Sequence, residues 1–531
     1  MDLVSLLSST TSKGNPNAWD VSKAYYDAGG DAWDISKAFY SNVSLSITGQ
    51  ETVPGGLFFK TDGTKMYVSG GQVKEINEYT LSTPWLVSSA SFVTNFSISA
   101  QGETYPSLFF KPDGTKFYTL GRGVASLEEY DLSTAWDISS ASHVQSLSLS
   151  STDVNAGGVF FKSDGLTLYF VGMLNDKVYQ FSLSTAWDIS TATFVQDFSI
   201  SAQEATPTAL FFGSDGTKMY VMGFTGDDIN EYALSTAWDI STASYVQNFS
   251  VSSQDATPTG LYFTPNGAGF YVCGDAGNSV YQYSIGGFSV AAQETAPNGL
   301  FFKPDGTKMY IIGRTGDDVN EYGLSTAWDI ATASYTQNFS VAGQETNPYD
   351  IAFKSDGTKM YICGGDGRDV NEYSLSTAWD ISTASYVQNF SIAAQDAVPY
   401  GMCFSQDGTN MYIAGYDGQD INQYSLSTAW DISTASYVRN FSYASQDTRG
   451  TSVFFDTSGL YMYVHGAIND FVNQYVLTTP WDISTASYLQ HFYVRPQDSE
   501  IQGIFWKDDG TQFFAVGLDR DRVFSYLISE E

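Results

Sequence analysis

Residues 293–343 read QETAPNGLFFKPDGTKMYIIGRTGDDVNEYGLSTAWDIATASYTQNFSVAG, and this unit recurs along the 531-residue chain. The glycine of its tight turn returns ten times, at Gly63, Gly114, Gly165, Gly216, Gly267, Gly306, Gly357, Gly408, Gly459 and Gly510. Eight of the nine intervals between these glycines are 51 residues long, and the interval from Gly267 to Gly306 is 39. A repeat of such constant length predicts one repetitive architecture and not a series of unrelated domains.

Each repeat contains four segments typical of β-strands. In the repeat quoted above, residues 299–303, 307–312, 318–322 and 335–341 are rich in aromatic and β-branched residues, and Gly, Pro and Asp separate them. Pro304-Asp305-Gly306 is a turn signal between the first two segments. Because four antiparallel strands per 40 to 50 residues are typical of a propeller blade, the sequence predicts an all-β propeller of ten four-stranded blades of about 51 residues.

The string P-x-G-L-x-F-x-x-D-G-T-x-M-Y-[VI]-x-G, which runs from Pro297 to Gly313, resembles the YVTN-type, lactonase-like propeller repeat. The resemblance extends from about residue 42 to the C-terminus. It implies that the Gly-Leu-Phe-Phe strand is innermost and that the Asn-Phe-Ser-Val strand is outermost. It says little about activity, because propellers carry many unrelated functions.

The ends of the chain suggest how the blades close. Residues 42–47 resemble an outer strand, and residues 523–527 resemble a third strand with no outer strand after it. Pairing of these segments would close one ring over residues 32–531, with residues 1–31 as an arm. The Gly286-Gly287 pair, interpreted as a two-residue hairpin, favours this single ring. The alternative is two five-bladed propellers in tandem, split near residue 286, because known rings have four to eight blades.

Charge and composition exclude several classes of function. The chain has 24 Lys and Arg against 58 Asp and Glu, a net charge of −34, which argues against nucleic-acid binding and against docking on an anionic membrane. We expect no membrane span and no signal peptide. Three cysteines, Cys273, Cys363 and Cys403, suggest small apolar core residues and not disulfides. With only three histidines, a zinc site or a Cys/His nucleophile is not expected.

An acidic residue precedes the first strand of nearly every repeat, and these residues are Glu51, Asp153, Glu204, Asp255, Glu294, Glu345, Asp396, Asp447 and Asp498; in the second repeat Glu103 is shifted by one. In a propeller these carboxylates would surround the mouth of the channel. They could form a ring that concentrates cations such as Ca²⁺, which prefers oxygen ligands, and no other cofactor is expected. Alternatively, each carboxylate accepts hydrogen bonds from the backbone amides of its own loop, and its recurrence in nearly every repeat favours this interpretation.

Two further sets of residues are candidates for binding a partner. The loops between the second and third strands are acidic, and Asp228, Asp318, Asp369 and Asp420 lie where a binding face would vary, although turn formation on a solvated rim is the favoured interpretation. Tryptophans of the Ala-Trp-Asp-Ile-Ser type would stack on a ligand if exposed, or hold a loop down if buried. Their regular recurrence favours the structural role for the set Trp85, Trp136, Trp187, Trp238, Trp328, Trp379, Trp430 and Trp481.

The arm contains a near copy of residues 32–40, fourteen residues earlier, that includes Trp19, Tyr25 and Tyr26. Such an aromatic extension before a rigid domain suggests a docking segment. We therefore expect the arm to bind other proteins of an oligomeric assembly.

No catalytic constellation emerges from the sequence, so we expect no enzyme activity. The long array of DGTKMY…LSTAWDIS repeats resembles repeat proteins of tailed bacteriophage virions. The sequence therefore suggests a tail-fibre, receptor-binding or decoration subunit that binds a host glycan or protein. The alternatives are a secreted or surface-bound bacterial adhesin or lectin, and a lactonase-like enzyme.

Overall fold

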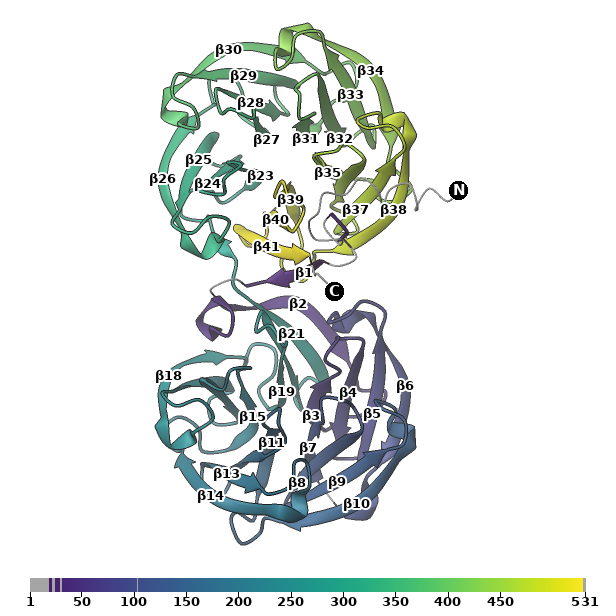
Figure 1. The fold of residues 1–531 in the computed structure, drawn as a ribbon, viewed down its shortest axis with the longest axis vertical. Helices are drawn as coiled ribbons and strands as arrows, with labels where there is room; N and C mark the ends of the chain where they lie inside the picture. The colour runs from purple at the N-terminus through teal and green to yellow at the C-terminus, as the bar shows by residue number, and fades with distance from the viewer. Residues whose placement is uncertain (1–18, 22–23, 29–30, 103, 529–531) are drawn as a thin grey trace. The chain divides into compact units, whose positions relative to one another are not determined.

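The computed structural model describes residues 19–21, 24–28, 31–102 and 104–528, and it confirms the all-β class and the ten antiparallel sheets. The strands form two compact units. Residues 32–285 form one unit, here called the N-terminal ring, and residues 286–531 together with residues 1–31 form the other, here called the C-terminal ring (Figure 1). Each unit contains five blades, which we number one to ten in the order of their innermost strands.

Five four-stranded blades form the N-terminal ring. The innermost strands are β3 (Pro54–Phe59), β7 (Thr104–Phe110), β11 (Ala156–Phe161), β15 (Pro207–Phe212) and β19 (Pro258–Phe263). The second strands are β4 (Lys65–Gly70), β8 (Lys116–Arg122), β12 (Thr167–Gly172), β16 (Lys218–Gly223) and β20 (Gly269–Gly274). The third strands are β5 (Glu75–Leu81), β9 (Ser126–Leu132), β13 (Lys177–Leu183), β17 (Asp228–Leu234) and β21 (Ser279–Ile285). The outer strands are β6 (Ala90–Ser97), β10 (Ala141–Ser148), β14 (Ala192–Ser199), β18 (Ala243–Ser250) and β2 (Ala38–Ser46).

The C-terminal ring repeats this plan. Its innermost strands are β23 (Pro297–Phe302), β27 (Pro348–Phe353), β31 (Pro399–Phe404), β35 (Gly450–Phe455) and β39 (Ile501–Trp506). The second strands are β24 (Lys308–Gly313), β28 (Lys359–Gly364), β32 (Asn410–Gly415), β36 (Tyr461–Gly466) and β40 (Gln512–Gly517). The third strands are β25 (Asp318–Leu324), β29 (Asp369–Leu375), β33 (Asp420–Leu426), β37 (Phe471–Leu477) and β41 (Arg522–Ile528). The outer strands are β26 (Ala333–Ser340), β30 (Ala384–Ser391), β34 (Ala435–Ser442), β38 (Ala486–Tyr493), and the pair β1 (Ala24–Asp27) and β22 (Phe288–Ser289).

The preferred prediction of one ten-bladed ring is wrong, and the alternative of two five-bladed rings is correct. Strand β2, which contains residues 42–46, pairs with β21 of blade five and not with β41. Strand β3 packs against β19, and β23 packs against β39, so each set of five innermost strands closes on itself. The physical reason is that the N-terminal segment supplies two outer strands, one for each incomplete blade.

The outer strand of blade ten is built from two pieces of the chain. Strand β1 pairs with β41 between Ala24 and Ile528, and β22 pairs with the beginning of β41 between Phe288 and Val523. The N-terminal ring is therefore inserted within this one strand. The hairpin predicted at Gly286-Gly287 is also wrong, because β21 and β22 belong to different sheets. The twelve residues missing from the short repeat interval are replaced by the segment around β1.

In every blade a tryptophan packs against the turn between the first and second strands. Its indole ring lies on the turn glycine, which has a positive φ, and a Cβ added to that glycine would come within 2.2 to 2.5 Å of the ring. In the two blades that close the rings, the tryptophan comes from the N-terminal segment, with Trp33 on Gly267 and Trp19 on Gly510. These contacts explain why both residue types recur in every repeat.

A second contact joins neighbouring blades. The tyrosine of the second strand donates its hydroxyl to the backbone oxygen of the tryptophan in the next blade, as Tyr310 does to Trp379 at 2.7 Å. The series crosses the closure of the N-terminal ring, where Tyr271 of blade five donates to Trp85 of blade one, and Tyr463 of blade nine donates to Trp19 in blade ten. Blade ten has Phe514 in place of this tyrosine.

Short 3-10 helices precede the outer strands: η3 (Ile35–Lys37), η4 (Val87–Ser89), η6 (Ile138–Ser140), η7 (Ile189–Thr191), η8 (Ile240–Thr242), η9 (Ile330–Thr332), η10 (Ile381–Thr383), η11 (Ile432–Thr434) and η12 (Ile483–Thr485); η5 (Ser99–Gln101) follows β6. The Asp of the Trp-Asp-Ile motif caps most of them, as Asp137 accepts from the backbone amide of Ser139 at 3.0 Å. No helix in the described part of the chain is long and apolar enough to cross a membrane.

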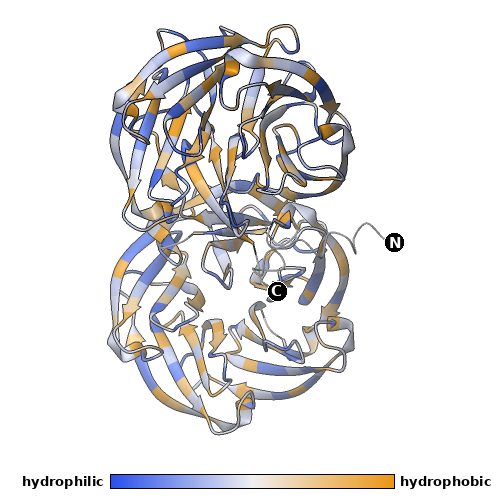
Figure 2. Cartoon of the chain, turned by 45° about the horizontal axis from the view of Figure 1, so that its top comes forward, coloured by the Kyte–Doolittle hydropathy of each residue, from blue (hydrophilic) through white to orange (hydrophobic). Residues whose placement is uncertain are grey.

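Burial follows the strand order within a blade. The innermost and second strands are almost entirely buried, whereas an outer strand such as β18 alternates between half-buried and exposed residues. Hydrophobic and hydrophilic residues alternate along the outer strands accordingly (Figure 2). The core of each ring thus lies between the inner halves of its blades, which fixes the residues that face the central channel.

Candidate functional site in the axial channel

The predicted carboxylate ring consists of separate loop clamps. Each of the nine described carboxylates is at most 4% exposed. Glu345 is typical, because it accepts from the amide of Asn347 at 2.8 Å and from the amides of Asp366 and Gly367 at 3.1 and 3.0 Å. The carboxylate joins its own loop to the loop between the second and third strands. The same pattern occurs at Glu51, Asp153, Glu204, Asp255, Glu294, Asp396, Asp447 and Asp498.

The geometry of these clamps is that of an anion surrounded by N–H donors, which is the structural interpretation of the motif. Glu103 lies outside the described residues. Among the residues that the structure describes, no three His, Cys, Asp or Glu side chains form a group that could hold a metal ion.

The four aspartates predicted on the rim are buried at the start of the third strands of their blades. Asp318 is 7% exposed and begins β25, where its carboxylate accepts from the side-chain amides of Asn320 and Asn338. Asp228, Asp369 and Asp420 make the same two contacts in their own blades. These aspartates join the third strand to the outer strand, because a buried carboxylate needs donors.

The aromatic residues predicted on a free arm belong instead to the C-terminal ring. Trp19 is stacked on Trp506 with ring centroids 5.4 Å apart, and its backbone amide donates to Gly510 at 3.0 Å. Tyr25 and Tyr26 are in β1, and the ring of Tyr26 packs against Tyr526. The predicted boundary at residue 31 is therefore wrong for residues 19–28. Residues 1–18 lie outside the described part of the chain.

Five aromatic side chains form a circle in the channel of the N-terminal ring. One comes from each innermost strand, and consecutive rings meet edge to face at centroid distances of 5.1 to 5.5 Å and interplanar angles of 69 to 72°. The set is Phe58, Phe109, Phe160, Phe211 and Tyr262. Edge-to-face packing of this kind is favourable, and here it forms a complete circle.

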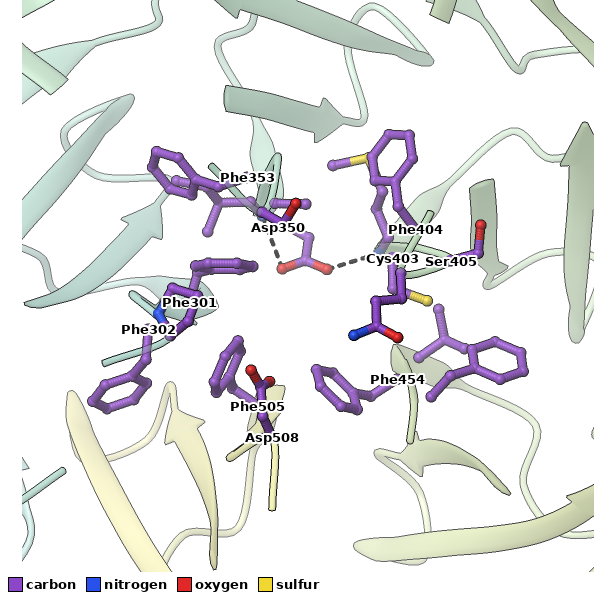
Figure 3. A pocket seen from close by; sticks show the side chains of 18 of the residues that line it. Phe301, Phe302, Asp350, Phe353, Cys403, Phe404, Ser405, Phe454, Phe505 and Asp508 are labelled. Carbon is purple, nitrogen blue, oxygen red and sulfur yellow. Dashed lines mark hydrogen bonds between the residues drawn. The ribbon is translucent and has the colours of Figure 1, made fainter. Parts of the chain in front are cut away.

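The corresponding circle in the C-terminal ring is broken. Phe301, Phe454 and Phe505 keep their edge-to-face contacts, at 5.0 and 5.5 Å. The other two positions are occupied by Ala352 and Cys403. Loss of two aromatic rings leaves a cavity of about 190 Å³ that these five residues line (Figure 3).

A carboxyl group, that of Asp350, projects into this cavity from β27. Figure 3 shows it directed between Phe301 and Cys403. Its two oxygens accept from the backbone amides of Ile351 and Met402, at 2.8 and 2.7 Å. The other nine repeats have glycine, alanine or serine at this position. Gly299 of the adjacent blade makes the space, because a Cβ there would lie 2.7 Å from the Asp350 carboxylate.

Burial raises the pKa of Asp350 to about 7, although its two backbone hydrogen bonds act in the opposite direction. No described Lys, Arg or His forms an ion pair with it. Burial, together with the charge of Asp350, also raises the pKa of the Cys403 thiol well above its usual value. Cys403 is therefore a neutral, partly exposed thiol in the cavity wall and not an activated nucleophile.

Tyrosine and arginine side chains lie at the opposite end of the same channel. Tyr349 and Tyr400, one residue before Asp350 and one residue before Gly401, pack with ring centroids 4.2 Å apart. The guanidinium of Arg314 lies 5.9 Å from the centre of the Tyr349 ring, and that of Arg449 lies 5.9 Å from Tyr400. These aromatic and cationic side chains lie near the beginnings of the innermost strands, on the side of the loop clamps.

The cavity is suited to holding a small group by contact with aromatic surfaces and one carboxyl group. The sequence does contain an indication of this cavity, because the innermost strands of blades seven and eight read PYDIAF and PYGMCF, whereas that of blade six reads PNGLFF. The departures at Asp350, Ala352 and Cys403 indicate a site only when they are considered together.

The chain was compared with protein families, curated proteins and solved structures. No protein-family model matches the chain, and no curated protein matches its sequence. Among solved structures, a putative 6-phosphogluconolactonase from Bacteroides uniformis is 13% identical, with 72% of this chain and 97% of that chain covered and a TM-score of 0.25. A functionally unknown protein from Desulfotomaculum acetoxidans is 11% identical, with 72% and 94% covered and a TM-score of 0.21. Likenesses of this extent carry no argument about the family or the activity of the chain.

Proposed function

We propose that the chain is a non-catalytic binding protein whose C-terminal ring takes a small ligand group into its axial cavity. We assign a structural role to the N-terminal ring, in which the circle of five aromatic side chains is complete. The observation that carries the proposal is the pair of substitutions, Ala352 and Cys403, that opens the aromatic circle in one ring only. Concave, mostly apolar sites with a few polar groups are the usual form of ligand pockets.

Filling the cavity tests this proposal. The variant A352F restores an aromatic ring at a position where the N-terminal ring accommodates one in every blade, so the fold should tolerate it. We expect wild-type protein to bind benzyl alcohol or benzylamine in ligand-observed NMR, and A352F to lose this binding. The matched control A352S keeps the cavity and should still bind. Equal binding by A352F and the wild type would place the ligand elsewhere.

We further propose that the chain is part of a tailed-phage virion and takes part in host attachment, through this cavity or through another surface. Its support is the repeat resemblance, the acidic composition and the lack of a catalytic constellation. A bacterial surface adhesin is the alternative setting. Mass spectrometry of purified phage particles, with the host secretome as the control sample, distinguishes the two.

A further inference from the structure

The charges that line the cavity of the C-terminal ring are all negative. Asp350, Asp456 and Asp508 line it, and its lining contains no Lys or Arg. In three blades of this ring a lysine precedes the turn and pairs with the turn aspartate, as Lys303 does with Asp305 at 2.6 Å. Blades eight and nine instead have Ser405 and Asp456 at this position. At the turns of this ring, two of the five lysines that the repeat would supply are therefore absent, and the other three are paired with turn aspartates.

The walls of the cavity consist of aromatic rings and polarisable sulfur-containing side chains. Phe301, Phe454 and Phe505 present their rings to it, and Met402 and Cys403 add sulfur. Aromatic faces attract ammonium groups electrostatically, and the attraction is stronger where water is excluded. The same surfaces give an anion no comparable stabilisation.

Asp350 provides the specific contact. Each of its oxygens accepts one backbone hydrogen bond, and each retains lone-pair capacity toward the cavity. The groups that face it from the strands packed around it are the thiols of Cys363 on β28 and Cys403 on β31, while β23 contributes Gly299. Both thiols stay neutral because burial raises their pKa well above the usual value. A buried carboxylate without a cationic partner is unfavourable, and a cation brought by the ligand would complete the pair.

We infer that the ligand of the C-terminal ring is an organic cation, with an ammonium group at Asp350 and an apolar body between the phenylalanines. This inference rests on the function proposed above and specifies its ligand class. It is independent of whether the chain acts in a virion or on a cell surface.

Three probes of similar size and different charge test the inference: benzylammonium, benzyl alcohol and benzoate. Titration of the full-length protein at pH 8, followed by NMR or calorimetry, should show benzylammonium binding at least tenfold more tightly than benzyl alcohol, with benzoate weakest. In D350N the preference for the ammonium probe should disappear, while benzyl alcohol binding persists. At pH 5, where Asp350 is protonated, the wild type should also lose most of its preference; this measurement needs no variant.

The possible failures are distinguishable. If benzyl alcohol or benzoate binds wild-type protein as tightly as benzylammonium does, or if D350N keeps the preference, the cation inference is overturned and the binding cavity stands. If none of the three probes binds at millimolar concentration, or if A352F binds them all unchanged, the proposed function itself fails and the inference fails with it.

Discussion

Replacement of Trp19 by alanine should destabilise the C-terminal ring alone. Trp19 contacts Gly510 and stacks on Trp506, and it reaches this blade from the opposite end of the chain. Removing a buried aromatic side chain costs about 3–5 kcal/mol. Because part of the Trp19 indole remains exposed, and the backbone bonds of residue 19 persist in alanine, we expect about 3 kcal/mol. At 1.4 kcal/mol per factor of ten, this is roughly a hundredfold increase in the open population of the ring.

The natural cysteines report which ring opens. Cys273 is buried in the N-terminal ring, and Cys363 is buried in the C-terminal ring. Pulse alkylation under native conditions, read by peptide mass spectrometry, should show Cys363 reacting about a hundredfold faster in W19A, with Cys273 unchanged. The matched variant W33A removes the tryptophan that lies on Gly267, so it should accelerate Cys273 and leave Cys363 unchanged.

Two outcomes would refute this reasoning. If W19A accelerates Cys273 as much as Cys363, the two rings unfold as one cooperative unit. If it leaves Cys363 unchanged, residues 19–28 do not close the C-terminal ring. Deletion of residues 1–31 should have a larger effect on Cys363 than W19A, whereas a free docking arm could be removed without affecting either ring.

Three further predictions concern the repeat and the cavity. E345Q weakens three charge-assisted amide contacts, so the C-terminal ring should lose about 2 kcal/mol in urea unfolding, and millimolar Ca²⁺ should not restore it; recovery with Ca²⁺ would instead indicate a metal site. The folded pKa of Asp350, about 7, lies above its unfolded value, so ionisation of this group destabilises the folded state, and stability is lost as the pH rises toward 7. Between pH 5 and pH 8 the wild type should therefore lose about 3 kcal/mol more than D350N, and equal pH dependence in urea midpoints would contradict the burial argument. Y310F removes the hydroxyl that bonds Trp379 and should cost about 1 kcal/mol in thermal unfolding, a tolerable loss because blade ten has Phe514 at this position; a loss several times larger would mean that the contact has another role.

Local features of the fold were predictable because each repeat carries them within a few residues. The turn at Pro304-Asp305-Gly306 and the strands on either side of it depend on nearby chain conformation, and the structure has them where the sequence indicates. Ring closure is different, because two similar N-terminal segments are available to complete two blades. It depends on which segment pairs with blade five and which pairs with blade ten. Residues 32–40 and their earlier copy at 18–26 are nearly identical, so sequence similarity does not assign their partners. The 39-residue interval measures how much of a blade is missing but does not show where the replacement lies.

The candidate site shows the same limit. The carboxylate clamps follow from a motif that is repeated in nearly every blade, and regularity indicated a structural role. Asp350, Ala352 and Cys403 are departures from the repeat, and they are separated by up to 53 residues. Only the ring geometry shows that all three face one cavity. In a propeller, residues that deviate at channel-facing positions are more informative about function than residues that recur.

The interrupted outer strand of blade ten also sets an order of events during synthesis. Strand β1 leaves the ribosome first, and its partner β41 is translated about 500 residues later, after the N-terminal ring is complete. At about 5–20 residues per second, residues 24–27 wait roughly 25–100 s for the strand that they pair with. Blade ten is therefore assembled last. Until β1 and β41 pair, residues 24–27 and the free edge of the sheet that contains β41 are both open to pairing with another nascent chain.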